Sequence, residues 1–282
     1  MRKLATVLVA LCLLFSLPGA AATKKPTTKK TTTTKKKATK KKTVKKPCAH
    51  SLADCPDEGC GTVSAKGVKS FDPNLNIQKN RHPDDPVAQG PAESWTLQEM
   101  KDLPDPEDFK KGDPRDELTA LGEGKKISVV AYLLIVRAEG GESCNCGLTD
   151  ESTSVGVNTD NHIVLVSRAT VDEFPVGDGV TGPAALKKRE PESITAEFTP
   201  RVRLAHPNFT RAKLQPLITA TEQKALRARV TGMLTFDSEH VGPRSLNRVN
   251  SWEIHPILML EVCPTDDCKA NSDVGWKSLD DL

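Results

Sequence analysis

The sequence has few aromatic side chains: seven Phe, three Trp and one Tyr among 282 residues. Proteins that bind single-stranded nucleic acid without sequence preference stack the bases on exposed rings along a basic groove. The strand pattern described below assigns Trp252 and Phe236 to a hydrophobic core. The shortage of rings therefore argues against nucleic-acid recognition by base stacking.

Familiar catalytic motifs are also missing. The sequence contains no HExxH, no G-x-S-x-G nucleophile elbow and no pair of CxxC motifs. These absences exclude HExxH zinc peptidases, hydrolases built on such an elbow, and zinc sites made of two CxxC pairs. Any reaction must be assigned from a looser grouping of side chains.

Long apolar runs are limited to the first 22 residues. Arg2 and Lys3 precede "LATVLVALCLLFSL", and "PGAAA" follows with small residues suited to cleavage near Ala21 or Ala22. The run is shorter than the about 20 residues that a membrane-spanning helix needs. We therefore predict a signal peptide over 1–22, no transmembrane span, and a mature protein that is secreted or periplasmic.

Acidic residues are absent from residues 23–47, which we call the lysine arm. Its sequence "TKKPTTKKTTTTKKKATKKKTVKKP" holds 12 lysines. This composition predicts disorder, because it offers too little apolar surface to offset the entropy lost on ordering. Removing these 12 charges and the two cations of the signal peptide from the net charge of +3 leaves −11 for residues 47–282. A basic arm thus precedes an acidic body.

Lysine-rich arms bind polyanions by releasing counterions, and this attraction weakens as salt rises. We predict a polyanion partner for the lysine arm: nucleic acid, an anionic glycan, a lipid surface or the protein's own acidic face. The alternative is a solvated spacer that holds the body away from a surface. The candidate anion-binding lysines are Lys35, Lys36, Lys37, Lys40, Lys41 and Lys42.

Seven cysteines remain after the signal peptide, and an oxidising exported environment favours disulfides. "CPDEGC" and "CPTDDC" each enclose four residues, a loop short enough to close locally. The odd count leaves at least one thiol free, bridged to another chain or bound to metal. The disulfide candidates are Cys48, Cys55, Cys60, Cys144, Cys146, Cys263 and Cys268.

The motif "ESCNC" places Cys144 and Cys146 two residues apart, so they rarely bond each other without strain. In one interpretation they are thiolate ligands that join His162 or His240 in a metal site. In the other, which the exported environment favours, a disulfide to Cys48 or another cysteine clasps the loop.

Residues 48–120 are rich in Pro, Asp and Gly and have few periodic apolar positions. They predict an irregular lead-in, partly tied by disulfides, that packs against a later domain. One short helix is expected over 94–103, with Ser94 as its N-cap and Glu99 in its first turns.

From Lys125 onward the chain becomes apolar and β-branched, which favours strands. In the last two strands we expect Val230, Leu234 and Phe236, then Trp252, Ile254, Leu258, Leu260 and Val262, to point inward, with Gly232 allowing a bend. The predicted elements are strands over 125–140, 162–169 and 193–204, a helix over 211–227 that Pro216 must start or break, and strands over 228–237 and 251–262.

The third predicted strand alternates in polarity, although Pro200 in its middle implies a bulge or an unpaired edge. Its outward residues include Arg201 and Arg203, which either form a modest anion-binding site or pair with Glu197 and its neighbours. Its inward residues are Ile194, Ala196, Phe198, Val202 and Leu204.

Three strands, a helix and two strands form the element order of the OB fold, a five-stranded Greek-key barrel. We therefore predict an all-β domain with one helix over 121–264, between the lead-in 48–120 and a C-terminal tail 265–282. The segments "ESCNC", "TPRVR", "VTGMLTFDSEH" and "SWEIHPI" resemble, in this order, an uncharacterised family of exported bacterial proteins with an OB-like barrel. The upstream "CPDEGCG" and "NLNIQKNR" fit the same pattern. The resemblance implies this architecture and no particular reaction.

Acidic and histidine residues recur near the ends of the last two strands. If these strands form a hairpin, their loop brings Asp237 and His240 near Glu253 and His255. A further acid–histidine pair, Asp160 and His162, opens the second strand. A divalent metal site at His162, His240, Glu253 and His255 is one hypothesis, and a carboxylate-held histidine acting as general base is another. The structural alternative pairs the acids with Arg244 and Arg248 and the histidines with loop backbone.

The charge split and the missing motifs lead to one main functional prediction. We expect an exported, non-enzymatic binding or interaction protein whose lysine arm binds a polyanion. The alternative is a metal-dependent enzyme, such as a hydrolase, built on the acid and histidine residues. A structural envelope component with a protein partner is a third interpretation.

Overall fold

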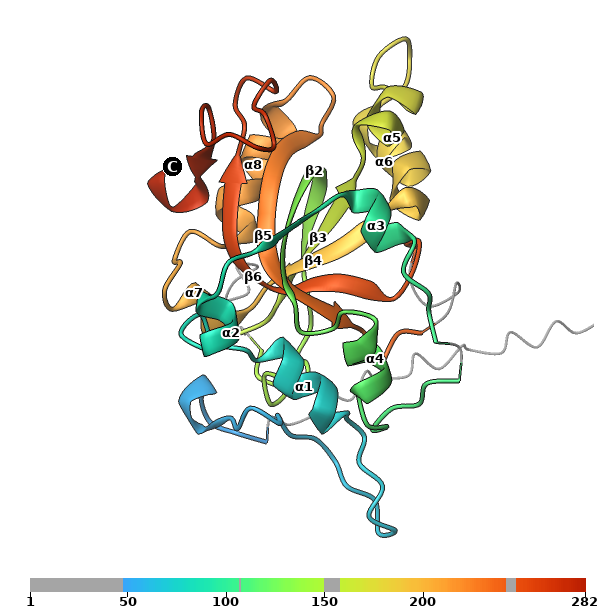
Figure 1. Cartoon of the computed structure of the whole chain (residues 1–282), viewed down its shortest axis with the longest axis vertical. Coiled ribbons are helices and arrows are strands. Elements are labelled where there is room, and N and C mark those ends of the chain that lie inside the picture. The colour runs from blue at the N-terminus through green and yellow to red at the C-terminus, as the bar shows by residue number, and fades with distance from the viewer. Residues whose placement is uncertain (1–47, 107, 150–157, 242–246) are drawn as a thin grey trace, which may run out of the picture. The chain divides into compact units, whose positions relative to one another are not determined.

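The structure, a computed structural model, describes residues 48–106, 108–149, 158–241 and 247–282 (Figure 1). The predicted signal peptide over 1–22 and the lysine arm with its candidate anion-binding lysines lie outside these ranges. Among the helices within them, none is long and apolar enough to cross a membrane.

Five strands form the closed barrel that the sequence predicts. They are β2 (Lys126–Ala138), β3 (Asn161–Val166), β4 (Ile194–Phe198), β5 (Leu226–Phe236) and β6 (Trp252–Val262). β3 pairs antiparallel with β2 and β4, β4 pairs parallel with β6, and β5 pairs antiparallel with both β6 and β2, which closes the wall. This mixed barrel confirms the all-β, OB-like architecture.

Helix α8 (Arg211–Ala220) lies between β4 and β5 in the chain, where a helix was expected, but it ends before the predicted Arg227. Its Leu214 and Ile218 are buried in the main hydrophobic core. Pro216 lies inside the helix without ending it. The five barrel strands therefore follow one another as predicted, with a helix between the third and the fourth.

Apolar residues of β5 and β6 fill the barrel interior. Gly232 lies where the register of β5 against β6 shifts. A Cβ atom there would lie 2.3 Å from the Pro256 carbonyl oxygen, so the close approach of the two strands requires glycine. The residues predicted to point inward are all buried: Val230, Leu234, Phe236, Trp252, Ile254, Leu258, Leu260 and Val262.

The third barrel strand is shorter than predicted, because the chain turns into a helix at Thr199. The Thr199 hydroxyl accepts a hydrogen bond from the Val202 amide and caps α7 (Pro200–Arg203), in which Pro200 takes the first position. The predicted bulge at Pro200 is therefore wrong. Leu204, expected in the core, is 81% exposed.

The sequence pattern predicts Arg201 and Arg203 on the outward face of a strand, but both lie in α7. Both side chains are buried and donate hydrogen bonds to backbone carbonyls, Arg201 to Cys55 at 2.8 Å and Arg203 to Phe209 at 2.9 Å. The predicted outward placement of the two arginines, on which the anion site depended, is therefore wrong.

Helices that the sequence did not predict connect β3 to β4. β3 ends at Val166, before the predicted 169, because the Ser167 hydroxyl accepts a hydrogen bond from the Thr170 amide and caps the next helix. The connection consists of α5 (Arg168–Glu173), α6 (Gly182–Arg189) and the 3-10 helix η2 (Glu190–Glu192).

The lead-in packs against the barrel, as predicted, and adds Leu97, Met100, Phe109 and Leu118 to the main core. Its elements are η1 (Leu52–Asp54), α1 (Pro73–Lys79), α2 (Pro86–Gln89), β1 (Glu93–Trp95), α3 (Leu97–Lys101) and α4 (Asp116–Ala120). Figure 1 shows α1, α2 and α4 grouped around one end of the barrel.

The helix predicted over 94–103 begins later than expected. Ser94 is part of β1, which pairs parallel with β2, and Thr96 caps α3 instead. The Thr96 hydroxyl accepts a hydrogen bond from the Glu99 amide while the Glu99 carboxylate accepts one from the Thr96 amide. This reciprocal pair is a capping box, so Glu99 marks the start of the helix.

Three disulfides connect six of the described cysteines. Cys263–Cys268 closes locally as predicted, but the local pairing of Cys55 with Cys60 is wrong. Cys60 bonds Cys48, and Cys55 bonds Cys146, which ties the lead-in to the loop between β2 and β3. Among the described cysteines Cys144 alone has no disulfide partner, and it is buried.

The C-terminal tail also packs against the barrel. β7 (Lys277–Ser278) pairs antiparallel with the end of β6, and η3 (Leu279–Asp281) follows it. Trp276 packs on the Cys263–Cys268 disulfide, and Leu279 is part of the main core. The tail is therefore part of the same folded unit as the barrel and the lead-in.

Candidate functional site

The described residues of two barrel loops converge on one patch of the outer wall: 139–149 and 158–160 of the β2–β3 loop, and 237–241 and 247–251 of the β5–β6 loop. In OB folds these loops and the neighbouring strands form the usual ligand-binding face. Helix α1 contacts β5 and β6, and its Lys79 Nζ lies 3.2 Å from Glu142 Oε2 of the β2–β3 loop. We call this patch the charge cluster: Lys79, Glu142, Cys144, Asp160, His162, Glu197, Asp237, His240, Arg248, Glu253 and His255.

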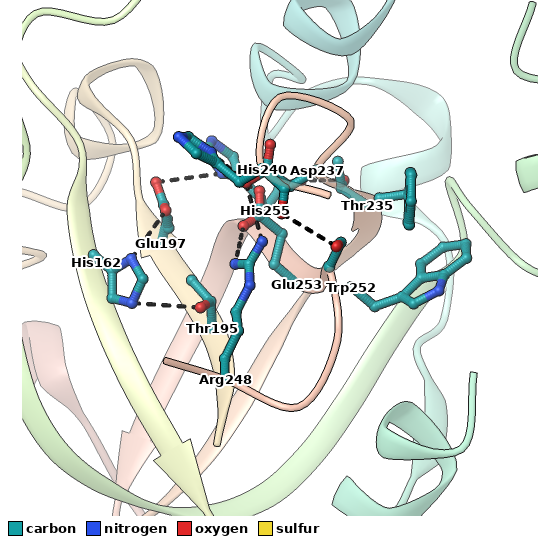
Figure 2. Close-up of polar contacts among 12 residues, drawn as sticks. His162, Thr195, Glu197, Thr235, Asp237, His240, Arg248, Trp252, Glu253 and His255 are labelled. Carbon is teal, nitrogen blue, oxygen red and sulfur yellow. Dashed lines mark hydrogen bonds and ion pairs between the residues drawn. The ribbon is translucent and has the colours of Figure 1, made fainter. Parts of the chain in front are cut away.

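Strand register places the cluster members that come from the barrel wall. His162 lies opposite Glu197 across β3 and β4, and Thr195 lies opposite Glu253 across β4 and β6. Glu253 and His255 are two residues apart and so share one face, as predicted. Figure 2 shows the Trp252 indole, one residue away, pointing away from these carboxylates.

His255 has the most enclosed position in the charge cluster. Its side chain is fully buried, with Nδ1 3.2 Å from Glu253 Oε1 and 3.4 Å from Glu197 Oε2. On the other side of the ring, Nε2 lies 3.5 Å from Asp160 Oδ2. Three carboxylates from β4, β6 and the β2–β3 loop thus surround one imidazole.

Arg248 connects the carboxylates nearest the β5–β6 loop. It donates hydrogen bonds to Glu253 at 3.1 Å and to Asp237 at 3.0 Å, while His240 Nδ1 lies 2.8 Å from Asp237 Oδ2 (Figure 2). These contacts are the acid–arginine pairing that the structural alternative predicts for Arg248. Arg244 lies outside the described residues.

His162 lies at the edge of the cluster. Its Nε2 is 3.4 Å from the Thr195 hydroxyl, and its Nδ1 is 3.6 Å from Glu197 and 3.8 Å from Glu139 (Figure 2). Glu197 therefore lies between two histidines, His162 on β3 and His255 on β6.

Burial and charge compete within the cluster. Burial opposes a charge on His255, but the Glu197 and Glu253 carboxylates outweigh it and raise the pKa of His255 to about 9. Burial, reinforced by repulsion from Glu142, raises the pKa of Asp160 to about 7. The patch therefore retains protons near neutral pH.

The pKa values of Glu197, Asp237 and Lys79 shift so that their charged forms are favoured. Burial disfavours their charge, yet His255 keeps the pKa of Glu197 below its ordinary value, and a hydrogen bond from His240 does the same for Asp237. On Lys79, burial is outweighed by attraction to Glu142 and other acids, so its pKa is raised. These groups are therefore charged at neutral pH.

Cys144 brings a thiol to the same patch. Its Sγ lies 3.3 Å from Glu142 Oε2 and 3.8 Å from Asp160 Oδ2. Burial and the neighbouring Asp160 raise its pKa, so the thiol stays protonated unless a cation binds beside it.

Metal-ligand distances select a different set of residues from the predicted one. One ligand atom each from Asp160, Glu197 and His255 lies within 4.8 Å of the others, and the same holds for Glu142, Cys144 and Asp160. Of the predicted metal ligands, His255 belongs to the group with Asp160 and Glu197, and Glu253 contacts the His255 ring. His162 and His240 pair with carboxylates at the edge of the cluster. Those metal assignments remain predictions.

Sequence reasoning did not select Glu197 or Glu142 as candidate ligands. Glu197 was assigned to pairing with Arg201 and Arg203, which the turn at Thr199 prevents from sharing its strand face. The signal that could have found Glu197 is its antiparallel register with His162. No protein-family model, curated protein or solved structure matches the chain.

Proposed function

We propose that the chain is an exported binding protein whose lysine arm binds a polyanion and thereby positions the acidic body near that polymer or surface. The observation that carries the proposal is the charge split, with 12 lysines in the arm and a net charge of −11 after it. A basic arm attracts anionic partners, and an acidic body attracts cationic ones.

The charge cluster supports placing the polyanion on the arm. The usual ligand face of an OB-like barrel carries Asp160, Glu197, Asp237 and Glu253 in this chain, and α1 of the lead-in covers part of it. The cations of this face, Lys79 and Arg248, are buried and paired with carboxylates, so they are not available to an anionic polymer. Arg201 and Arg203, the other predicted anion site, donate to backbone carbonyls instead.

Retention on heparin and on DNA tests this proposal. We expect the mature chain to elute at a clearly higher salt concentration than a chain that begins at Pro47, because counterion release makes the affinity depend steeply on salt. A full-length control replaces Lys35, Lys36, Lys37, Lys40, Lys41 and Lys42 by Gln and should elute between the two. Equal retention of all three proteins would refute polyanion binding by the lysine arm.

The type of polymer is decided by competition. Titrating bound protein with heparin, duplex DNA and anionic phospholipid vesicles at matched charge concentration ranks the three polyanions. If the lysine arm acts only through charge density, the ranking follows charge spacing and disappears at high salt. A preference that persists at high salt would assign recognition to the body instead.

The second candidate function is metal-dependent hydrolysis, which the ligand distances among Asp160, Glu197 and His255 favour. Its difficulty is that all three side chains are buried, so a substrate reaches them only if the covering loops or α1 move. Hydrolysis of model esters and phosphate esters with added zinc or manganese tests it. Activity lost in His255→Ala would support an enzyme, and activity retained there would refute this site.

A further inference from the structure

We propose that the charge cluster contains a zinc site in which Asp160, Glu197 and His255 are the protein ligands. The ligand atoms of a tetrahedral zinc site lie about 3.4 Å apart when the bonds are near 2.0–2.1 Å. His255 Nε2 and Asp160 Oδ2 are 3.5 Å apart. The ion would lie on the outer wall of the barrel.

Two buried atoms independently point to a ligand at this place. Glu197 Oε2 and His255 Nε2 have no hydrogen-bond partner among the described residues, although their side chains are almost completely enclosed. Buried polar atoms in native proteins are nearly always satisfied, so each such exception requires an explanation. One bound cation accounts for both atoms.

The surroundings of His255 favour Nε2 as the ligand atom. Glu253 Oε1 lies 3.2 Å from Nδ1, and Arg248 holds the other oxygen of the same carboxylate at 3.1 Å. A carboxylate on the far nitrogen is the usual way in which a metal-binding histidine is oriented. Glu253, predicted as a ligand, therefore becomes the residue that orients one.

Charge at the patch is also compatible with a divalent ion. With histidines left aside, the carboxylates of Glu142, Asp160, Glu197, Asp237 and Glu253 exceed the permanent cations Lys79, Arg248 and the adjacent Arg203 by two. Buried charges are strongly unfavourable unless they are paired or bound to metal. Protonated His240 and His255 supply two further positive charges, so a divalent cation must take the place of a proton on His255.

The donor atoms select the metal. The imidazole of His255 and the carboxylates of Asp160 and Glu197 combine nitrogen and oxygen donors. Mixed sets of this kind suit zinc, whereas calcium and magnesium take oxygen ligands. The ion would join the β2–β3 loop, β4 and β6, three segments that are distant in the chain.

Zinc content of the metal-stripped and reloaded mature protein is the first measurement. We expect one zinc per chain by elemental analysis, a matching stoichiometry by calorimetry, and a melting temperature that rises with zinc concentration because the ion binds the folded state. Failure to bind stoichiometric zinc overturns the proposal.

Matched variants locate the ion. Asp160→Asn and His255→Gln should weaken zinc binding by more than about 100-fold, and Glu253→Gln by about 10- to 100-fold, as for other residues that orient ligands. His206→Gln is the control, because His206 bonds Asp280 of the C-terminal tail. Zinc affinity unchanged in Asp160→Asn and His255→Gln would place the ion elsewhere and overturn the assignment.

Cobalt(II) substitution keeps the test independent of whether variants fold. Cobalt in the unaltered protein should give the visible absorption of four-coordinate nitrogen and oxygen ligation without a thiolate charge-transfer band. Cys144→Ser should keep this spectrum. An octahedral spectrum, or a thiolate band in the unaltered protein, would contradict the proposed donor set.

Discussion

Where they meet the β5–β6 loop, strands β5 and β6 bury both of their faces, but with opposite chemistry. The inner face carries Phe236, Trp252 and Ile254, the outer face carries Glu253 and His255, and all five side chains are fully enclosed. The inner face is stabilised by apolar burial, which has no preferred direction. The outer face is stable only if each charge meets a partner, because an unpaired buried charge is strongly unfavourable.

Both faces take partners from the lead-in as well as from the barrel. Phe236 packs edge-to-face on Trp252, with ring centroids 5.2 Å apart, and on Phe109 of the lead-in at 5.8 Å. On the outer face, His255 meets Asp160 from the β2–β3 loop, and Lys79 of the lead-in bonds Glu142 of that loop. The two faces therefore differ in the chemistry of their contacts, which are ring packing on one side and charge pairing on the other.

The largest effect is expected on the inner face. Trp252→Ala should lower the free energy of unfolding by about 4 kcal/mol, because it leaves a cavity in the core and removes the hydrogen bond from Nε1 to the Pro104 carbonyl. Urea unfolding followed by circular dichroism measures the change. Val274→Ala, at an 81% exposed position, is the control and should stay within about 0.5 kcal/mol.

A slightly smaller loss is expected on the outer face. Arg248→Met should destabilise the protein by about 3 kcal/mol, because it leaves Asp237 and Glu253 buried without their shared cation. The same urea experiment measures this loss.

A rescue variant distinguishes charge from packing. Adding Asp237→Asn and Glu253→Gln to Arg248→Met removes the unpaired charges and should restore part of the lost stability. If the triple variant is less stable than Arg248→Met alone, the outer face depends on the shape of its side chains and the contrast between the two faces is wrong.

A third test removes the disulfide that ties the lead-in to the β2–β3 loop beside the outer face. Cys55→Ala combined with Cys146→Ala breaks the disulfide between the lead-in and the β2–β3 loop and should cost at least about 2 kcal/mol. Hydrogen exchange should become faster in the β2–β3 loop and remain slow in β5. Equal acceleration in both segments would mean that the two faces unfold together.

The inner face was predictable from the sequence because alternation is a local signal. Val230, Leu234 and Phe236 are separated by even numbers of residues, and one buried face is enough to assign them. The same rule failed after Phe198, where "TPRVR" continues to alternate but forms α7. Thr199 before Pro200 is a helix-start signal, an N-cap followed by proline at the first helical position, and it outweighs the alternation.

The outer face was only partly predictable, because its contacts depend on register and on distant segments. Glu253 and His255 share a face by spacing alone, and Arg248 was correctly named as a partner for the acids. Glu197 joins them only through the pairing of β4 with β3 and β6. The Cys55–Cys146 disulfide could not be chosen from spacing, since several pairings satisfy the same sequence.

The smallest expected effect concerns His240, at the rim of the outer face, where the charged network reaches solvent. A hydrogen bond to Asp237 raises the pKa of His240, so the folded state favours its protonated form. This stabilisation is fully present below about pH 6.5, the ordinary pKa, and is lost as the pH rises through the raised value. Because the side chain is 47% exposed, the contribution is screened and stays below about 1 kcal/mol. Urea unfolding of the wild type and His240→Gln between pH 6 and 9 should give a stability difference that shrinks as the pH increases, and a difference that grows over this range would contradict the pairing.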